Sequence, residues 1–273
     1  MAKENPLASN LTLEQQKNLF GNAYLNMLWH CPTDQRFPYW VHLPDCYYDE
    51  KDPHYKLLVI IHGTGCAVED YVRHAKELAD RDHVAVLAPL FPGGLIQRDD
   101  FNSYKLLSCD GVRYDQILLD MIDDMAKRYP GVETDKFFLF GHSGGGQFAN
   151  RFLFAHPEKL RACAIGAPGR PTFLNPDEDY FWGTRDFKNY FGHDVDLAAV
   201  QKVPVLVIVG ENDTKFIGDS PYGDNRVARM KSLQKNLQDH GVHTELTILP
   251  GFAHEGGEKE RVQAAQHFFE AYL

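Results

Sequence analysis

Apolar residues along this chain fall into short runs and helical periods that alternate. The strongest run, residues 57–61 (Leu-Leu-Val-Ile-Ile), is continuously apolar, as is typical of a parallel strand buried on both faces. Similar runs predict further strands at 39–43, 83–88, 136–140, 162–166, 203–209 and 244–249. Amphipathic periods predict helices at 12–30, 68–81, 112–129, from Ser143 to about residue 156, 224–239 and 258–272. The alternation predicts an α/β protein with a mostly parallel central sheet covered by helices on both faces.

Residues 167–200 interrupt this alternation. The stretch is rich in proline and aromatic residues and has only weak periodicity. A loop of this length is uncommon unless it has a function, so we interpret it as a small aromatic-rich lid over the sheet. No linker, repeat or low-complexity tract divides the chain. We therefore expect one domain over residues 1–273, with the helix at 12–30 as an N-terminal addition.

Composition narrows the classes of partner and compartment. With 273 residues and 44% hydrophobic content, the chain can bury one large core. Its net charge is −10 and it has no run of lysine or arginine, so neither nucleic acid nor an anionic membrane is an expected partner. The polar first ten residues do not resemble a secretory signal. No segment approaches the roughly 18 apolar residues of a membrane span.

Cysteine and histidine spacing gives no sign of a metal site. The five cysteines are odd in number and scattered, which suits reduced thiols in a cytoplasmic protein; they are Cys31, Cys46, Cys66, Cys109 and Cys163. Neither a CxxC nor an HExxH spacing occurs. We expect no metal and no other cofactor.

The most informative motif is Gly-His-Ser-Gly-Gly at 141–145. It follows an apolar run and precedes a helical pattern, which is the setting of a nucleophile elbow: a strand, a very tight turn and a helix. In such a turn the small residues on either side avoid clashes, and the hydroxyl of Ser143 stands clear at the helix N-terminus. The alternative is a glycine-rich turn without chemistry.

A serine hydroxyl needs a base to take its proton and a third group to orient that base. Asp213 follows the strand at 203–209, at the sheet edge where catalytic groups of parallel sheets collect, so it is the predicted acid. Glu211 and Asp219 are its rivals. His254 lies on a glycine-rich loop after the last predicted strand, from which it can reach Ser143, and is the predicted base.

The negative charge that develops on an attacked carbonyl oxygen also needs donors. Two backbone N–H groups usually serve. One is expected from Gly144, which follows the serine at the start of a helix. The other is expected from the loop His62-Gly63-Thr64-Gly65 after the strand at 57–61, with Thr64 favoured and Gly65 next.

Taken together, these motifs resemble the α/β-hydrolase superfamily, and the resemblance covers about residues 37–272. The stretch from Tyr114 to Pro157 is similar to the branch of esterases and polyhydroxybutyrate depolymerases, and prolyl-oligopeptidase-like peptidases share similar segments. The resemblance implies the α/β-hydrolase fold and acyl transfer to water through an acyl-enzyme, without a cofactor. The chain departs from the pattern at the N-terminal helix and the aromatic insertion.

Substrate contacts are expected from the segments that overhang the serine. Phe173 and Trp182 could form an aromatic wall, or could pack the insertion onto the body of the protein. Arg170, like Arg98, could bind a substrate carboxylate, although ordinary ion pairs with neighbouring aspartates are favoured; those aspartates are Asp177, Asp99 and Asp100. Gly65 is a further candidate for contact with substrate.

The leading hypothesis is a serine hydrolase that cleaves a small carboxylic ester, with lactones close behind. A peptidase or amidase would use the same groups, as would a C–C bond hydrolase or an acyltransferase. A non-catalytic binder of small molecules on the same scaffold is the alternative from another class. The expected partner is a small-molecule substrate, and the chain could act alone or as a homodimer.

Overall fold

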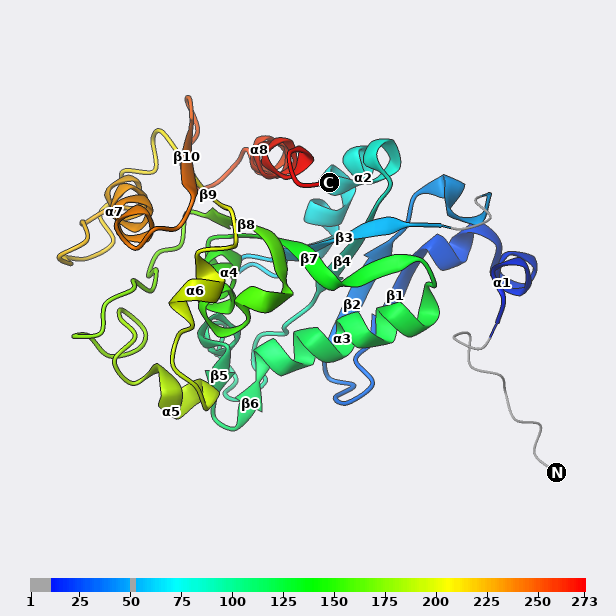
Figure 1. Cartoon of the computed structure of the whole chain (residues 1–273), viewed down its shortest axis with the longest axis horizontal. Coiled ribbons are helices and arrows are strands. Elements are labelled where there is room, and N and C mark those ends of the chain that lie inside the picture. Colours follow the sequence, from blue (N-terminus) through cyan, green and yellow to red (C-terminus); the bar gives the residue numbers. More distant parts are fainter. Residues whose placement is uncertain (1–10, 50–52) are drawn as a thin grey trace.

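An eight-stranded sheet forms the centre of the computed structural model, which describes residues 11–49 and 53–273 (Figure 1). The strand order is β1-β2-β4-β3-β7-β8-β9-β10. The strands are β1 (Asn26–His30), β2 (Pro38–His42), β3 (Tyr55–Ile61), β4 (Val84–Pro89), β7 (Val132–His142), β8 (Leu160–Gly166), β9 (Val205–Gly210) and β10 (Thr244–Leu249). β2 is antiparallel to both neighbours, and the strands from β4 to β10 pair in parallel. The predicted α/β fold with a mostly parallel sheet is confirmed.

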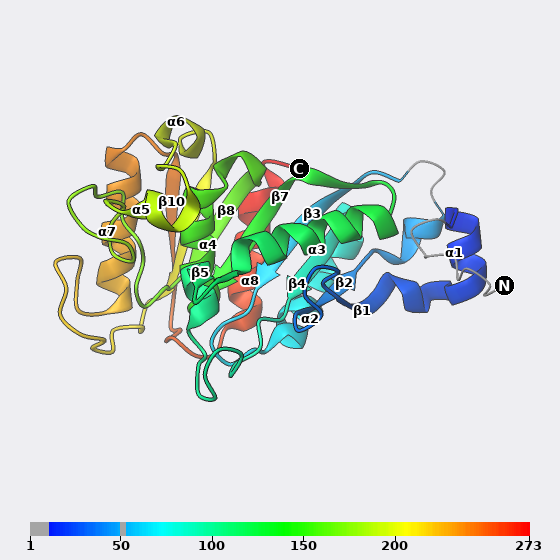
Figure 2. The same cartoon turned by 90° about the horizontal axis from the view of Figure 1, so that it is seen from below.

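Helices cover both faces of this sheet, as Figure 2 shows from below. Residues alternate along each strand: Leu58 and Ile60 of β3 face one layer, while Leu57 and Val59 face the other. The first layer contains α2 (Val68–Asp82) and α8 (Glu258–Glu270), and the second contains α3 (Tyr114–Arg128), α4 (Gly144–Ala155) and α7 (Arg226–Asp239). Because both faces are buried there, residues 57–61 of β3 are all apolar.

The N-terminal segment corrects one prediction. The expected helix at 12–30 is only α1 (Leu13–Phe20), followed by the 3-10 helix η2 (Gly21–Leu25) and by β1. Gly21 ends the helix with a φ of 56°, in the left-handed region. The next residues then add an antiparallel strand to β2, with Met27 and Trp29 packed against the core. The helical period in this stretch was a coincidence of spacing.

Two segments between the main strands and helices contain short elements. Residues 90–113 include η4 (Ser103–Leu106) and a small hairpin of β5 (Ser108–Cys109) and β6 (Val112–Arg113). The insertion at 167–200 contains α5 (Phe187–Phe191) and α6 (Leu197–Val200). Most of its aromatic side chains pack into the core, among them Phe173, Tyr180, Phe187 and Phe191. That the insertion acts as a lid stays a prediction.

Two further expectations concern the chain as a whole. All five cysteines lie in the described part of the chain and have free thiols. Among residues 11–49 and 53–273, every helix is too short or too polar to cross a membrane. The first ten residues, whose polar composition argued against a secretory signal, lie outside the described residues.

A buried ion cluster ties α3 to the end of α4. The Asp115 carboxylate is fully buried, accepts hydrogen bonds from Arg113 and lies 2.8 Å from Nε2 of His156. Burial opposes ionisation, but the hydrogen bonds from His156 and Arg113 outweigh it and lower the pKa of Asp115 to about 2. Because the folded pKa is below the ordinary value of 3.8, the cluster stabilises the fold above pH 4, and this contribution is lost as the pH falls towards 2.

Replacing Asp115 should therefore change how stability depends on acid. In Asp115→Asn, the free energy of unfolding should fall less steeply between pH 5 and pH 3 than in the wild type, by about 1 kcal/mol over that interval. Urea unfolding at both pH values measures the difference, with Asp123→Asn, on the exposed face of the same helix, as the control. Equal slopes in the wild type and Asp115→Asn would contradict the assignment.

Candidate active site

Ser143 lies in the turn between β7 and α4 with a strained backbone. Its φ and ψ are 57° and −112°, a region that costs a non-glycine residue about 1–3 kcal/mol. The turn is tight enough to exclude side chains on either side. A Cβ at Gly141 would lie 2.2 Å from the carbonyl oxygen of Gly145, and one at Gly145 would lie 2.1 Å from that of Ile61. These contacts explain both glycines of the motif and leave the half-buried serine side chain at the helix N-terminus.

Ser143, His254 and Asp213 are joined by hydrogen bonds. Nε2 of His254 is 2.9 Å from Oγ of Ser143, and Nδ1 is 2.7 Å from Oδ2 of Asp213. An ionised carboxylate only accepts, so Nδ1 carries the hydrogen and the lone pair of Nε2 faces the serine hydroxyl. Asp213 is 1% exposed, which keeps water from competing for this contact. The structure thus brings together the three residues predicted from sequence.

The two rival acids lie elsewhere. Glu211 turns towards the loop after β10, where its Oε2 accepts a hydrogen bond from the N–H of Gly251. Asp219 is exposed on the rim of a different cavity. Asp213 reaches His254 because the chain turns sharply after β9, with the N–H of Asp213 donating to the carbonyl of Gly210 at 3.1 Å.

The loop that carries His254 is held by a buried arginine that the sequence analysis missed. Arg261, 1% exposed on α8, donates to the carbonyls of Ala253 (2.6 Å), His254 (3.1 Å) and Gly256. The carbonyl of His254 also accepts from Nε2 of His142 at 3.2 Å. Burial, and then the charge of Arg261, lower the pKa of His142 well below 6.5, so its imidazole is neutral. The helical period offered a signal, because Arg261 falls on the apolar face of its helix.

A second arginine, Arg226, donates a hydrogen bond to the predicted acid, Asp213. Nη1 of Arg226, at the start of α7, is 3.3 Å from Oδ1 of Asp213. Asp213 thus has one oxygen on the imidazole and the other on a guanidinium, which fixes the plane of the carboxylate. Nothing in the local sequence singles out this arginine, since the two residues meet only through the fold.

The loop after β3 has a fixed conformation beside the serine. Nε2 of His62 accepts a hydrogen bond from the N–H of Phe91 at 3.0 Å, so Nδ1 is the donor to the carbonyl of Gly63 at 2.6 Å. Burial dominates in lowering the pKa of His62 to about 4. Since C=O and N–H point in opposite directions in a trans peptide, the N–H of Thr64 points away from His62. The Thr64 nitrogen lies 3.2 Å from the position a Cβ would occupy on Gly144, so both predicted oxyanion donors are neighbours.

These groups line an open cleft of about 450 Å³, which we call the Ser143 cleft. Gly65, a predicted substrate contact, is part of its wall together with Thr64. The remaining lining residues are Gly63, Ala67, Asp70, Tyr71, His142, Ser143, Arg226, His254, Glu255 and Glu258.

Of the other predicted substrate contacts, one is buried in the core and two line a different cavity. Phe173 is fully buried and stacks on Tyr222 with ring centroids 3.5 Å apart, so it packs the insertion onto the body of the protein and does not form a wall. Trp182 and Arg170 both line a second cavity of about 680 Å³, whose wall also includes Gln147 of α4.

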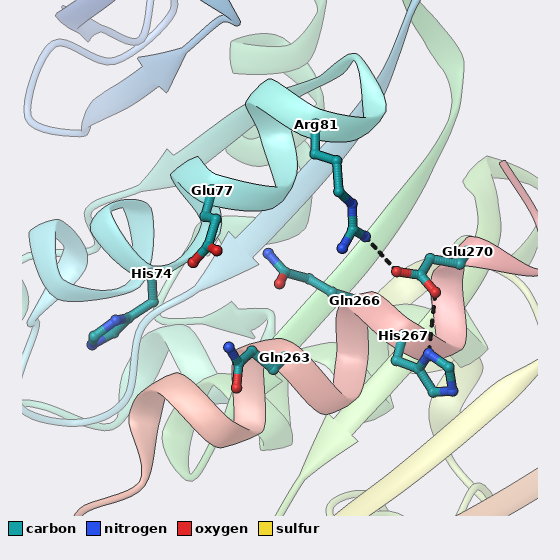
Figure 3. Close-up of a pocket in the computed structure, with 7 residues that line it drawn as sticks. All are labelled: His74, Glu77, Arg81, Gln263, Gln266, His267 and Glu270. Atoms are coloured by element: carbon teal, nitrogen blue, oxygen red, sulfur yellow. Dashed lines mark hydrogen bonds and ion pairs between the residues drawn. The ribbon is translucent and has the colours of Figure 1, made fainter.

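A third cavity, of about 520 Å³, lies between α2 and α8 (Figure 3). Its polar side chains include Arg81, Glu270 and His267, with Glu270 bonded to both of the others. It contains no serine or cysteine nucleophile. Within the described residues, no histidine, cysteine and carboxylate side chains are grouped closely enough to hold a metal ion.

Comparison with known protein structures supports the fold. The chain resembles a poly(aspartic acid) hydrolase from Sphingomonas sp. KT-1 (20% identity, TM-score 0.72, covering 89% of this chain and 96% of the other). It also resembles a poly(3-hydroxybutyrate) depolymerase from Bordetella parapertussis (19% identity, TM-score 0.70, covering 98% of this chain and 97% of the other). A ferulic acid esterase is similar as well (17% identity, TM-score 0.65, covering 91% of this chain and 97% of the other). At these identities the likeness shows the fold. No curated protein matches the sequence.

The family itself is shown by sequence. Residues 44–271 match the model of the dienelactone hydrolase family, so the match includes every element that carries Ser143, Asp213 and His254. The chain therefore belongs to the dienelactone hydrolase family and is a hydrolase with the α/β-hydrolase fold.

Proposed function

We propose that this protein hydrolyses a small carboxylic ester, or a lactone, through an acyl-enzyme on Ser143. The observation that carries the proposal is the unbroken contact from Ser143 through His254 to Asp213, at 2.9 and 2.7 Å, beside an open cleft. In each contact the donor and acceptor are the ones that the chemistry needs.

In the proposed reaction, Oγ of Ser143 attacks the carbonyl carbon while Nε2 of His254 takes the hydroxyl proton. Asp213 stabilises the imidazolium that forms. The oxyanion of the tetrahedral intermediate accepts from the N–H groups of Gly144 and Thr64, each worth about 3 kcal/mol where such donors have been removed. The intermediate collapses as His254 gives its proton to the leaving alcohol, which in a lactone stays attached to the acyl chain.

The second half repeats these steps with water. His254 takes a proton from water as its oxygen attacks the acyl-enzyme, and the same two N–H groups hold the second oxyanion. Collapse releases the carboxylic acid and returns the proton to Oγ of Ser143. No group beyond the side chains and backbone already described is required.

An amide substrate is the second candidate. The poly(aspartic acid) hydrolase among the structural relatives is named for a polyamide, and amide hydrolysis would use the same three residues. The test below therefore includes an amide.

Hydrolysis of a matched set of substrates tests the proposal. A short-chain ester, an aromatic ester, a lactone and an aminoacyl anilide should show faster turnover of esters or lactones than of the anilide. Ser143→Ala should lose about 10³-fold or more of the kcat of the wild type, and so should His254→Ala, with unchanged thermal unfolding. A preference for the anilide would assign an amidase. Equal rates in the wild type and Ser143→Ala would show that this serine is not the nucleophile.

A second prediction concerns Arg261, which positions His254. Arg261→Met removes the donors to three carbonyls of the His254 loop and should lower kcat by about 10- to 100-fold with little change in KM, because the misplaced group is the base. Steady-state kinetics on the best ester measures this. Arg73→Met, on the exposed face of α2, is the matched control. Wild-type kcat in an Arg261→Met protein with a normal unfolding transition would contradict the positioning role.

A further inference from the structure

The cavity beside the Ser143 cleft is lined by several basic side chains. We call it the cationic pocket; its volume is about 680 Å³. Its charged lining side chains are Lys105, Arg170, Arg229 and a single carboxylate, Asp219. The other lining residues are Asn102, Leu106, Gln147, Gly169, Phe181, Trp182, Ile217 and Gly218.

Lys105 is a buried cation with only neutral partners. It is 6% exposed, and its Nζ donates to Oδ1 of Asn102 at 2.6 Å. Arg151, fully buried behind it, donates to the carbonyl of Lys105 and to Oγ1 of Thr172. Burial, and then the charge of Arg151, lower the pKa of Lys105 to about 8. A positive charge held here against burial and a like charge lacks its counter-charge.

Arg229 and Arg170, which also line the cationic pocket, likewise lack a carboxylate partner among the described residues. Arg229 is 3% exposed, and its guanidinium donates only to the backbone carbonyls of Gly169, Gly218 and Gly223. Arg170 and Arg229 both lie against the ring of Trp182, with guanidinium carbons 5.6 and 5.2 Å from its centroid. Both guanidinium groups contact one indole, and neither has a carboxylate partner among the described residues.

No acidic side chain balances these cations. Across the described ranges, no carboxylate lies within ion-pair distance of Lys105, Arg151, Arg170 or Arg229, although the whole chain has a net charge of −10. Asp219 stands exposed at the rim, and Asp100 and Asp224 act on the pocket only at longer range. Three lining cations and one lining carboxylate leave an excess of two positive charges, which suits a doubly charged anion.

The cationic pocket adjoins the reacting serine. Cε of Lys105 is 2.7 Å from the position a Cβ would take on Gly144, the residue after Ser143. On the other side, a Cβ on Gly169 would lie 3.5 Å from Nη2 of Arg226, which lines the Ser143 cleft. Residues that line the two cavities are therefore neighbours on both sides of the elbow.

We propose that the cationic pocket binds a doubly charged anionic group of the substrate, a phosphate monoester or a pair of carboxylates, while the ester lies at Ser143. This inference rests on the proposed hydrolase function and names its substrate class. Lys105 and Arg229 form the buried part of the subsite, and Arg170 closes it from the exposed side.

Esters whose acyl groups carry different charges test the proposal. The probes are 4-nitrophenyl esters with a butanoyl, a succinyl, a tricarballyl and a 4-phosphonobutanoyl acyl group. We expect kcat/KM to be about tenfold or more higher for a doubly charged ester than for the butanoyl ester, as charge-assisted hydrogen bonds imply. Arg170→Gln should lower this ratio by about tenfold, and Lys188→Gln, an exposed cation of the same insertion, should leave it unchanged. Equal values of kcat/KM for the charged esters and the butanoyl ester in the wild type would overturn the inference and leave the hydrolase function standing.

Direct binding provides a readout that does not depend on turnover. Titration calorimetry of the wild-type protein with inorganic phosphate and with glutarate should show binding of at least one, weakened about tenfold or more in Lys105→Met. The stronger of the two identifies phosphate or dicarboxylate as the group bound. Binding by a protein that hydrolyses no ester would support the subsite and refute the proposed function. Absence of binding, or equal binding by Lys105→Met, would refute the subsite.

Discussion

The left-handed backbone at Ser143 is the constraint on which the site depends. β7 must become α4 within a single residue, and the contacts of about 2 Å that a Cβ would make at Gly141 and Gly145 show how closely the strand, the helix and β3 approach one another. The strain within this turn is confined to Ser143. A hydrogen bond from the N–H of Ser143 to the carbonyl of Gly166 on β8 helps to hold the residue in this conformation. Its consequence is a hydroxyl that projects from the sheet edge at a helix N-terminus.

The remaining groups come to this hydroxyl from the carboxyl ends of neighbouring strands. Thr64 follows β3, Asp213 follows β9 and His254 follows β10, so the parallel order of the sheet sets their approximate distances. The exact positions of the loops that carry His254 and Thr64 depend on buried arginine and histidine side chains that hydrogen-bond to backbone carbonyls. Arg261 does this for the loop of His254, and His62 does it for the loop of Thr64. Arg261 and His62, which fix these two loops, do not line the Ser143 cleft themselves.

Much of this arrangement was predictable, because it is encoded locally. Continuous apolar runs identified the buried strands. The acid and the base were found on loops after strands, in the chain order that α/β-hydrolases share. Phe173 could not be assigned from sequence, since an aromatic residue in a proline-rich stretch can line a cavity or pack inward, and only the fold decides. The segment at 26–30 was mistaken for helix because Met27 and Leu28 continue the helical period of the residues before them, although Met27 and Trp29 also fit an alternating pattern. Arg226 and the unbalanced charges of the cationic pocket arise from contacts between residues distant in sequence, which no local pattern reports.

The central claim is that the fold activates one hydroxyl among all the serines of the chain. Intact-protein mass spectrometry after brief exposure to a fluorophosphonate tests it most directly, because that reagent phosphonylates a serine only when a base removes its proton. The account predicts one adduct per chain, located on Ser143 by peptide mapping and absent from the folded Ser143→Ala and His254→Ala variants. An unmodified wild-type protein, or an adduct that persists in Ser143→Ala, would contradict it.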